Sequence, residues 1–280
     1  MYKGFSAGLI GFGEKSLEEY APVAAKLGYE GVDFNLAAEY SKGAGYVREY
    51  LDKYKLKLGG FVLPVDIHAE KNKYDEDLKA LPEYCKFAAD TGNLRCIMWV
   101  LPFSDTLSYS ENFEFHRKRF GECARILEEY GIRLGLEFIG PATLRKGHKF
   151  EFIHSLDGLL ELNSAIGCPN MGLLIDTFHW DLAGQKPEDF KKIPSKEYIV
   201  LAHINDAAAG VPLDEQIDSV RELPGATNVL NIEAFMKGLV SVGYDGPVYV
   251  EPFNEALKAM SFEHAAEKTK AAMDSVWPIV

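Results

Sequence analysis

The sequence predicts a single (β/α)8 TIM barrel of the α/β class that spans residues 1–280. Short apolar runs alternate along the chain with longer stretches of helical periodicity, which is the pattern of repeated strand–helix–strand units in a parallel sheet. The apolar runs number eight, and a chain of 280 residues has the length of one such barrel. These two observations favour a closed barrel.

The eight predicted strands are short runs rich in aliphatic and aromatic residues. They lie at residues 5–12, 30–35, 56–65, 95–102, 133–138, 171–176, 198–205 and 247–253. No serine-, glycine- or proline-rich linker divides them, so one domain is predicted.

Helices are predicted between the strands from start signals and periodicity. Ser16 precedes a segment with glutamates in its first turn, and the segment from Glu111 has apolar residues at helical spacing and ends at a glycine. The predicted helices are residues 17–29, 111–131, 154–167, 187–193, 231–244 and 261–277.

The alternative fold is an open, doubly wound sheet. Such a sheet normally opens its first helix with a GxGxxG loop. Gly8, Gly11 and Gly13 are spaced GLIGFG and do not match that loop, so the barrel is preferred.

The charge balance disfavours a nucleic-acid partner. The 30 basic and 42 acidic side chains give a net charge of -12, with a pI near 5.1. A phosphodiester backbone repels such a protein. We therefore expect a small-molecule partner.

The sequence also lacks the usual signals for export and membrane insertion. Residues 1–20 carry no basic segment and no small-residue cleavage site, and charges interrupt every apolar run well short of about 18 residues. We expect a cytoplasmic protein with no membrane partner. The four cysteines form no CxxC pair, so we expect buried small hydrophobes rather than disulfides or a thiolate zinc site.

Four neighbouring predicted strands end in side chains that can bind metals. Glu137, Asp176 and Glu251 close the fifth, sixth and eighth strands, and His203 lies near the end of the seventh. The carboxyl ends of barrel strands open on one face, so these four side chains should lie side by side around half of the rim.

Three carboxylates at the edge of an apolar core repel one another and would take up protons unless a cation lay among them. A divalent cation removes that cost. Carboxylates with one imidazole suit Mn²⁺ or Mg²⁺, with Zn²⁺ or Co²⁺ as alternatives, and Mn²⁺ is our first choice.

These residues occur in the segments GLEF, LLIDTFH, AHIND and YVEPF. In that order and at those intervals, the segments resemble the xylose-isomerase-like barrel superfamily. That superfamily includes sugar isomerases, ketose 3-epimerases, hydroxypyruvate isomerase, the inosose-processing enzymes and the apurinic-site endonucleases. The resemblance covers essentially the whole chain and is strongest in its second half.

The resemblance implies that Glu137, Asp176, His203 and Glu251 bind one divalent metal ion, and that Glu137 and Glu251 also form the acid/base pair. The implied activity is isomerisation or epimerisation of a small sugar, keto-sugar or sugar derivative by proton transfer through an enediolate. It further implies that His179 points at a substrate oxygen. Arg221 resembles the family arginine that holds a substrate hydroxyl.

The loop after the fifth predicted strand departs from the ketose 3-epimerase pattern. Those enzymes have a second glutamate six residues after the first metal ligand, where this sequence has Thr143. The loop instead carries Arg145, Lys146, His148 and Lys149, which could recognise a phosphate or carboxylate but as a charge run are more typical of a solvated surface.

The endonuclease members carry an extra aspartate–arginine–histidine cluster after the seventh strand. Residues 206–225 contain no histidine here, which argues against DNA repair. Asp206 is predicted to orient His203 or to contact water bound to the metal.

The first half of the sequence offers weaker signals. Asp66 and His68 follow the third predicted strand, and Trp99 and Phe103 lie at the end of the fourth. We expect His68 and Trp99 to contact the substrate, since aromatic faces stack on the apolar side of a sugar ring. A turn position for His68 and a core position for Trp99 are the alternatives.

Two other functions fit the same residues. A dehydratase or lyase would begin with the same proton abstraction and then expel a β-substituent from an inosose or 3-keto sugar. A non-catalytic sugar-binding barrel, or a subunit that needs a partner, is the alternative from another class. The sequence is compatible with a homo-oligomer.

Overall fold

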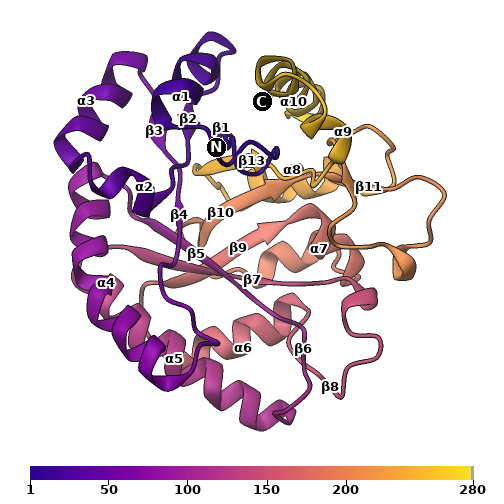
Figure 1. Ribbon diagram of the computed structural model, residues 1–280. Coiled ribbons are helices and arrows are strands. Elements are labelled where there is room, and N and C mark those ends of the chain that lie inside the picture. The colour runs from indigo at the N-terminus through magenta and orange to yellow at the C-terminus, as the bar shows by residue number, and fades with distance from the viewer. Residues whose placement is uncertain (279–280) are drawn as a thin grey trace.

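The computed structural model, which describes residues 1–278, is a TIM barrel. All of the strand pairs around its main sheet are parallel, and the sheet order is β3-β2-β1-β13-β10-β9-β7-β5-β4. Its strands are β1 (Tyr2–Phe5), β2 (Gly31–Val32), β3 (Lys57–Leu58), β4 (Phe61–Val62), β5 (Arg95–Val100), β7 (Arg133–Phe138), β9 (Met171–Asp176), β10 (Ile199–Ile204) and β13 (Pro247–Val250). The predicted closed barrel is confirmed, and Figure 1 shows these strands enclosed by helices.

The third predicted strand is divided into β3 and β4, and the division closes the ring. β3 pairs with β2 and β4 pairs with β5, so the chain between them bridges the two edges of the sheet. Gly59 lies in this bridge against Tyr249, whose hydroxyl oxygen would be 1.4 Å from an added Cβ. Only a residue without a side chain fits beside the tyrosine ring.

The first predicted strand, residues 5–12, is wrong. The strand is β1, where Tyr2 pairs with Pro247, and residues 7–11 form turns. Gly11 has a φ of 94°, which a strand does not adopt. The apolar run GLIGF therefore belongs to a loop at the mouth of the barrel.

Helices surround the sheet, and the sequence analysis missed five of them: α2, α3, α4, α7 and α9. α3 and α4 are both amphipathic, but α4 contains Pro82, which weakens a helical pattern. The helices are α1 (Leu17–Lys26), α2 (Leu36–Tyr40), α3 (Ala44–Tyr54), α4 (Lys71–Thr91), α5 (Tyr109–Glu129), α6 (Leu156–Ile166), α7 (Thr177–Leu182), α8 (Ile232–Ser241), α9 (Glu255–Lys258) and α10 (Phe262–Val276). The predicted helix at residues 187–193 is a 3-10 helix, η2 (Pro187–Lys192).

Short elements lie in the loops. They are the ladders β6 (Phe103–Ser104) with β8 (Phe150–Glu151) and β11 (Asp206–Ala207) with β12 (Arg221–Glu222), and the 3-10 turns η1 (Ala142–Leu144), η3 (Lys196–Tyr198) and η4 (Leu213–Glu215). No helix within residues 1–278 is long and apolar enough to cross a membrane. The four cysteines are free thiols, and Cys168 alone among them is partly exposed.

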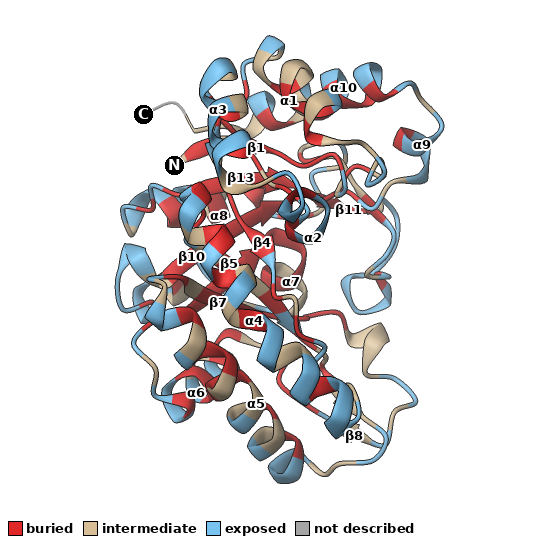
Figure 2. Ribbon diagram, turned by 60° about the vertical axis from the view of Figure 1, so that its left-hand side comes forward, coloured by how far each residue is buried: buried red, intermediate tan, exposed pale blue. Residues whose placement is uncertain are grey.

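The core has two compartments. The larger lies between the helices and the outer face of the sheet, and the smaller fills the barrel with Leu174, Leu201 and Tyr249, against which Leu9 and Ile97 pack. Figure 2 shows buried residues on the strands and on the inner faces of the surrounding helices. Successive strand residues alternate between the two compartments, which determines which side chains reach the barrel mouth.

Candidate active site

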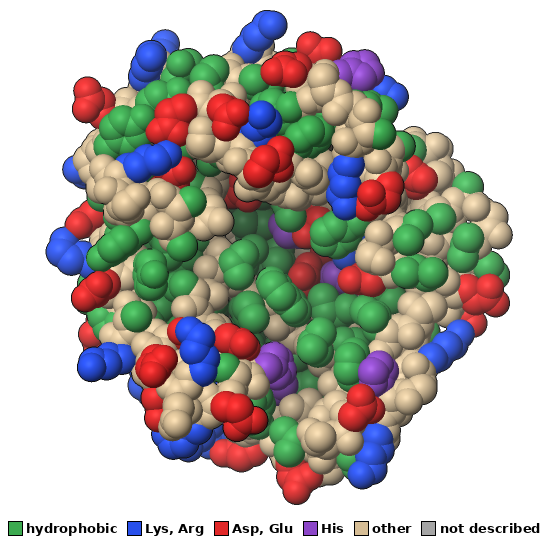
Figure 3. Space-filling view, in the orientation of Figure 1, with side chains coloured by type: hydrophobic (Ala, Val, Ile, Leu, Met, Phe, Trp, Pro, Cys, Tyr) green, Lys and Arg blue, Asp and Glu red, His purple; other side chains and the backbone are tan. Residues whose placement is uncertain are grey.

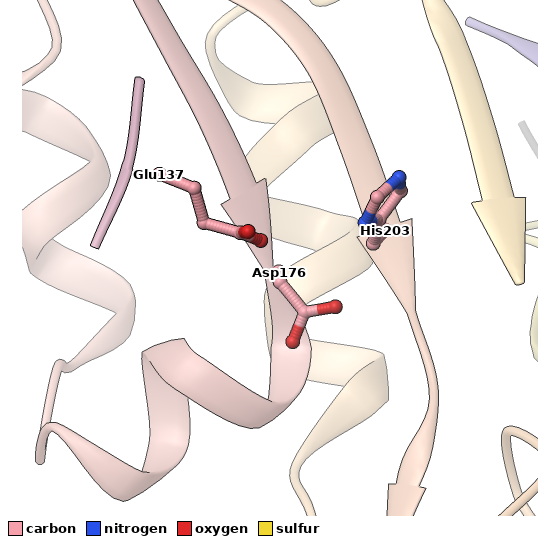
Figure 4. Close-up of side chains that lie close together, drawn as sticks. All are labelled: Glu137, Asp176 and His203. Carbon is pink, nitrogen blue, oxygen red and sulfur yellow. The ribbon is translucent and has the colours of Figure 1, made fainter. Parts of the chain in front are cut away.

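Three adjacent strands bring Glu137, Asp176 and His203 together inside the barrel. One ligand atom from each side chain lies within 4.8 Å of the others, and Figure 4 shows the three side chains at the ends of neighbouring strands. All three are buried. The predicted convergence of these strand ends is therefore present in the structure.

The strand pleat explains why these residues face inward. Leu174 and Leu201 fill the barrel interior, and Asp176 and His203 each follow one of them by two residues on the same strand. A spacing of two returns a side chain to the same face of a sheet. The register pairs Asp176 with His203 directly, so the two side chains lie next to each other.

The Asp176 carboxylate is held at both oxygens. Oδ1 accepts hydrogen bonds from the backbone N–H groups of Phe178 (2.7 Å) and His179 (3.2 Å), because Asp176 is also the N-cap of α7. Oδ2 accepts from Asn205 Nδ2 at 2.8 Å and from Arg221 Nη1 at 3.3 Å. The carboxylate therefore has a fixed orientation toward the barrel axis.

Glu251, the fourth predicted ligand, adjoins this cluster. Its Oε1 lies 3.4 Å from His203 Nδ1, and its Oε2 accepts a hydrogen bond from Arg221 Nη1 at 2.7 Å. It is buried like the others. The sheet order β13-β10-β9-β7 places Glu251 and Glu137 at opposite ends of one arc.

Arg221 is buried in the middle of the acidic groups rather than exposed on a loop. Besides Asp176 and Glu251, it donates from Nη2 to Asp218 Oδ1 at 2.8 Å. Its guanidinium lies 4.7 Å from the Phe178 ring and 4.6 Å from the Phe253 ring. This cation offsets part of the negative charge of the site.

His179 is buried beside the cluster. Its Nε2 lies 3.2 Å from Arg221 Nη2 and 3.9 Å from Glu137 Oε1. The backbone N–H of Gly140 donates a hydrogen bond to the His179 Nδ1 at 3.3 Å. Nδ1 lies 3.7 Å from Asp218 Oδ1. Burial, followed by the charge of Arg221, lowers the pKa of His179 well below its ordinary value, so the ring is neutral.

The carboxyl groups of the cluster differ in their affinity for protons. Burial raises the pKa of Glu137 well above its usual range, and the Glu251 and Asp176 carboxylates add to this effect. Burial also raises the pKa of Asp176, to about 6, although Arg221 opposes it. For Glu251 the charges of His203 and Arg221 outweigh burial and hold the pKa at about 2.

The cluster fits a divalent cation. Glu137 Oε1 and His203 Nδ1 are buried, and neither has a hydrogen-bond partner within residues 1–278. Burial lowers the pKa of His203, but Glu251 and Asp176 outweigh it and raise the pKa above its ordinary value. The raised pKa values of Glu137 and His203 mean that this environment favours added positive charge. Carboxylate oxygens with one imidazole nitrogen are a donor set for Mn²⁺ or Zn²⁺.

The two predicted substrate contacts of the first half lie in different places. Trp99 pairs in register with Glu137, faces the barrel mouth and is 42% exposed. His68 lies in the loop before α4, and its ring contacts Phe115 and His116 of α5. Figure 3 shows a hollow in this face, where acidic and histidine side chains lie among hydrophobic ones. The structure places Trp99 beside the cluster and His68 against α5.

The loop after β7 is braced by its own residues. Thr143 Oγ1 donates to the Gln216 carbonyl at 2.7 Å, and Arg145 Nη1 donates to the Gly140 carbonyl at 2.7 Å. His148 stacks on Phe103 with ring centroids 3.5 Å apart, and Asp105 accepts from its Nδ1 at 2.9 Å and from the Lys149 backbone N–H at 3.0 Å. Lys146 Nζ donates to the Asp214 carbonyl at 3.2 Å. The cationic groups of this loop therefore serve local contacts.

The expectation for Asp206 is wrong. Its carboxylate accepts hydrogen bonds from the backbone N–H groups of Ala207, Thr227, Asn228 and Leu230 at 2.8 to 3.1 Å. These four donors saturate the carboxylate and fasten the loop between β12 and α8. Asp206 follows His203 by three residues, so the pleat does not carry it to the same face.

Three residues of the site were missed from the sequence. Asp218 accepts a hydrogen bond from Arg221, and Asn205 donates one to Asp176. Neither Asp218 nor Asn205 stands out in the sequence. Asp33 is different, because it ends the run EGVD just as Asp176 ends MGLLID. The same reasoning, applied to the second strand, would have found it.

Comparisons with known proteins agree with this architecture. A model of a family described as xylose isomerase-like TIM barrel matches residues 22–276. An inosose isomerase of Halalkalibacterium halodurans is 29% identical over 149 residues, which is 53% of this chain and 49% of that protein. One of Bacillus velezensis is 26% identical over 155 residues, or 55% of this chain and 52% of that protein. The alignments span about half the length of these curated relatives.

Solved structures cover nearly the whole chain. A xylose isomerase domain protein from Alicyclobacillus acidocaldarius has a TM-score of 0.88 with 28% identity and covers 99% of this chain and 98% of its own. The IOLI protein, solved with a zinc atom, has a TM-score of 0.82, 20% identity and the same coverage. D-psicose 3-epimerase from Clostridium cellulolyticum, solved with D-tagatose, has a TM-score of 0.76, 14% identity and the same coverage. The last two likenesses show the fold alone.

Proposed function

The chain belongs to the xylose isomerase-like TIM barrel family, and from that premise we propose that it is a divalent-metal-dependent isomerase or epimerase of a small keto-sugar or inosose. One observation carries the proposal. Glu137, Asp176 and His203 direct ligand atoms to within 4.8 Å of one another in a buried site. Such a set of charges is costly to bury unless it binds a cation.

Glu137, Asp176 and His203 would hold the cation, with Glu251 as the fourth ligand and Mn²⁺ as the proposed metal. A cation bound there polarises a carbonyl oxygen and so makes the adjacent C–H bond more acidic. The hydrogen bonds from Asn205 and from the start of α7 keep the Asp176 carboxylate in place while this occurs.

Glu137 and Glu251 are the proposed acid/base pair. They lie at the two ends of the arc formed by β13, β10, β9 and β7. A substrate bound over this arc would therefore have Glu251 on one side and Glu137 on the other. One glutamate removes a proton from the carbon next to the carbonyl group, and the other returns a proton. The result is either a carbonyl group moved to the adjacent carbon or an inverted configuration at the carbon that lost its proton. Arg221 donates to Glu251 and keeps it ionised, as a base requires.

The substrate class follows from the mouth of the barrel and from the relatives. Trp99 offers an apolar face beside Glu137, and sugar rings stack on such faces. The relatives named inosose isomerase and the neighbour solved with D-tagatose act on or bind polyhydroxylated ketones. His179 remains the proposed contact for a substrate oxygen.

The first test is elemental analysis of protein purified without added metal, repeated on single alanine variants of the four proposed ligands. We expect one equivalent of metal in the parent and its loss in Asp176→Ala and His203→Ala. The exposed Glu255→Ala variant, at the first residue of α9, is the matched control and should keep its metal. A parent protein that takes up no metal, even from excess Mn²⁺, would contradict the proposal.

The second test follows an inosose in deuterated buffer by NMR. Isomerisation or epimerisation keeps the mass of the substrate and incorporates solvent deuterium at carbon. Loss of water from the same substrate would identify a dehydratase, and binding without either change would identify a non-catalytic barrel.

A further inference from the structure

A cavity of about 470 Å³ opens beside the acidic cluster, at the ends of β1, β2 and β4. Its lining includes Ser6, Leu9, Asp33, Leu36 and Val62. The volume lies in the range of sites for small molecules, about 300–1,000 Å³. No function has been assigned so far to this half of the mouth, apart from the Trp99 face.

The strand register makes the cavity continuous with the proposed metal site. Lys3 pairs with Val248, and continuing this register by three residues sets Ser6 beside Glu251. Phe5 pairs with Val32, so the next pair sets Asp33 beside Ser6. Around the rim, the order is therefore Glu251, Ser6, Asp33.

Asp33 is the one carboxylate in the lining of the cavity. Its backbone is fixed on both sides, since its N–H donates to the Phe5 carbonyl at 3.3 Å and its carbonyl accepts from the Tyr20 hydroxyl at 2.8 Å. Within residues 1–278, its carboxylate makes no ion pair with a lysine or arginine. Burial raises its pKa to about 6, and the Ser6 hydroxyl and His203 oppose this shift. The side chain thus keeps acceptor capacity directed at the cavity.

The single cation in the lining is already paired. Lys15 Nζ lies 2.9 Å from Glu19 Oε1, outside the cavity lining, and over the Phe262 ring. Ser6 Oγ accepts a hydrogen bond from the Leu9 backbone N–H at 3.2 Å, and the Ser6 hydroxyl, as a hydrogen-bond donor, lowers the pKa of Asp33. The cavity therefore offers the Asp33 carboxylate, the Ser6 hydroxyl and the Asn35 amide among apolar residues, and within residues 1–278 its lining holds no unpaired cation.

We infer that Asp33 and Ser6 form a subsite for hydroxyl groups, which binds the end of a neutral polyol substrate remote from the metal ligands and discriminates against phosphorylated sugars. The inference rests on the proposed function and names its substrate class. Sugar hydroxyls donate to the Asp33 carboxylate, while Leu9 and Val62 contact C–H groups. A phosphate in the same place would lie against Asp33 without a cation to pair with, and like charges at that range repel.

The test uses the Mn²⁺-loaded protein and matched pairs of probes. D-fructose and D-fructose 6-phosphate differ only in the phosphate, and D-tagatose and an inosose extend the neutral set. Binding is measured by NMR titration, deuterium incorporation at carbon is followed in the same samples, and elemental analysis verifies one metal ion in every variant.

We expect the parent to bind D-fructose at least about tenfold more tightly than its 6-phosphate, since a hydrogen bond to a charged group is worth about that factor or more. Asp33→Ala should lose about tenfold in affinity for the neutral probes. Asp33→Asn, which keeps an acceptor but removes the charge, should lose less and should bind the phosphorylated probe more tightly than the parent does. Glu14→Gln removes a charge from the same loop outside the cavity lining and should change neither affinity.

Three results would overturn the inference: a parent that binds the phosphorylated probe as tightly as D-fructose, a parent that binds none of the neutral probes, or an Asp33→Ala variant with full metal content and unchanged affinities. The two proposals fail separately. Asp33-dependent binding without deuterium incorporation refutes the proposed function alone, whereas incorporation with unchanged affinity in Asp33→Ala refutes the subsite alone.

Discussion

The two halves of the barrel mouth are built differently. On one side, β7, β9 and β10 are six residues long and nearly every residue in them is buried. On the other, β2, β3 and β4 are two residues long, and loops supply most of the rim. The long-strand half, formed by β7, β9 and β10, carries the acidic and histidine cluster. The short-strand half, formed by β2, β3 and β4, carries the cavity with Asp33.

The two kinds of strand suit two different tasks: positioning metal-ligand side chains and recognising a substrate. Long parallel strands with full ladders of hydrogen bonds fix the backbone on both sides of each metal-ligand candidate, and ligands need fixed geometry. Short strands with long connections fix less of the chain, but they leave space for a substrate and allow varied contacts.

The largest effect is expected from the proposed acid/base pair. Glu251→Gln and Glu137→Gln should each lower the rate of deuterium incorporation about 10³-fold, within the range for loss of a general acid or base. The fold should persist, as measured by circular dichroism and thermal unfolding. Glu255→Gln is the control. Activity within tenfold of the parent in both glutamine variants would show that the arc does not supply the acid/base groups.

A large effect on stability is expected at Arg221. Arg221→Met leaves Asp176 and Glu251 buried without their cation, so the metal-free protein should lose about 3 kcal/mol of unfolding free energy. Mn²⁺ should restore part of this loss, because it supplies positive charge to the same carboxylates. Denaturant unfolding with and without Mn²⁺ measures both quantities. Arg117→Met, at an exposed ion pair on α5, should cost much less. Equal losses in the two variants would refute the charge-balancing role.

The segment that joins β3 to β4 should not tolerate a larger side chain at Gly59. Gly59→Ala places a methyl group on the Tyr249 ring, and such overpacking should destabilise the protein by about 3 kcal/mol. Tyr249→Leu in the same chain should recover part of the loss, since it removes the clashing atoms. A stable Gly59→Ala single variant would mean that the bridge can move away from the barrel interior.

Metal affinity should weaken as the pH falls. The pKa of Asp176 is raised to about 6 and that of Glu137 further, so these carboxyl groups take up protons at a higher pH than ordinary ones do. A cation must displace those protons. Below pH 6 the dissociation constant for Mn²⁺ should therefore rise by about tenfold or more per pH unit, as titration calorimetry can measure. A constant affinity between pH 8 and pH 5 would exclude these carboxylates as ligands.

The smallest effects should separate Trp99 and His68, the two proposed substrate contacts from the first half of the sequence. Trp99→Ala should raise the KM by about tenfold and change kcat little, because the ring would contact the substrate and not the transferred proton. His68→Ala should change KM less than about twofold, since its ring packs on Phe115 and His116. Steady-state kinetics on one neutral substrate compares them. Equal effects would mean that His68 also reaches the substrate.

The sequence predicted the long-strand half of the barrel mouth more accurately than the short-strand half. In the long-strand half, apolar runs that end at Glu137, Asp176 and Glu251 predicted both the strands and the meeting of their ends. In the other half, the run GLIGF was read as a strand but is a loop, and α3 and α4 were missed. The predicted strands at residues 30–35 and 56–65 do contain β2, β3 and β4, but these strands have only two residues each, and loops form the rest of the predicted ranges.

The sequence by itself determined the barrel and the chemical character of its rim, because the order of strands and helices and the residues at strand ends are local properties. The tertiary structure alone decided that Arg221 would be buried among the carboxylates, that Asp206 would fasten a loop rather than touch His203, and that Asp33 would face the cavity beside Ser6. These outcomes depend on pleat, register and charge balance between segments that lie far apart in the sequence. Only the closed barrel brings such segments together.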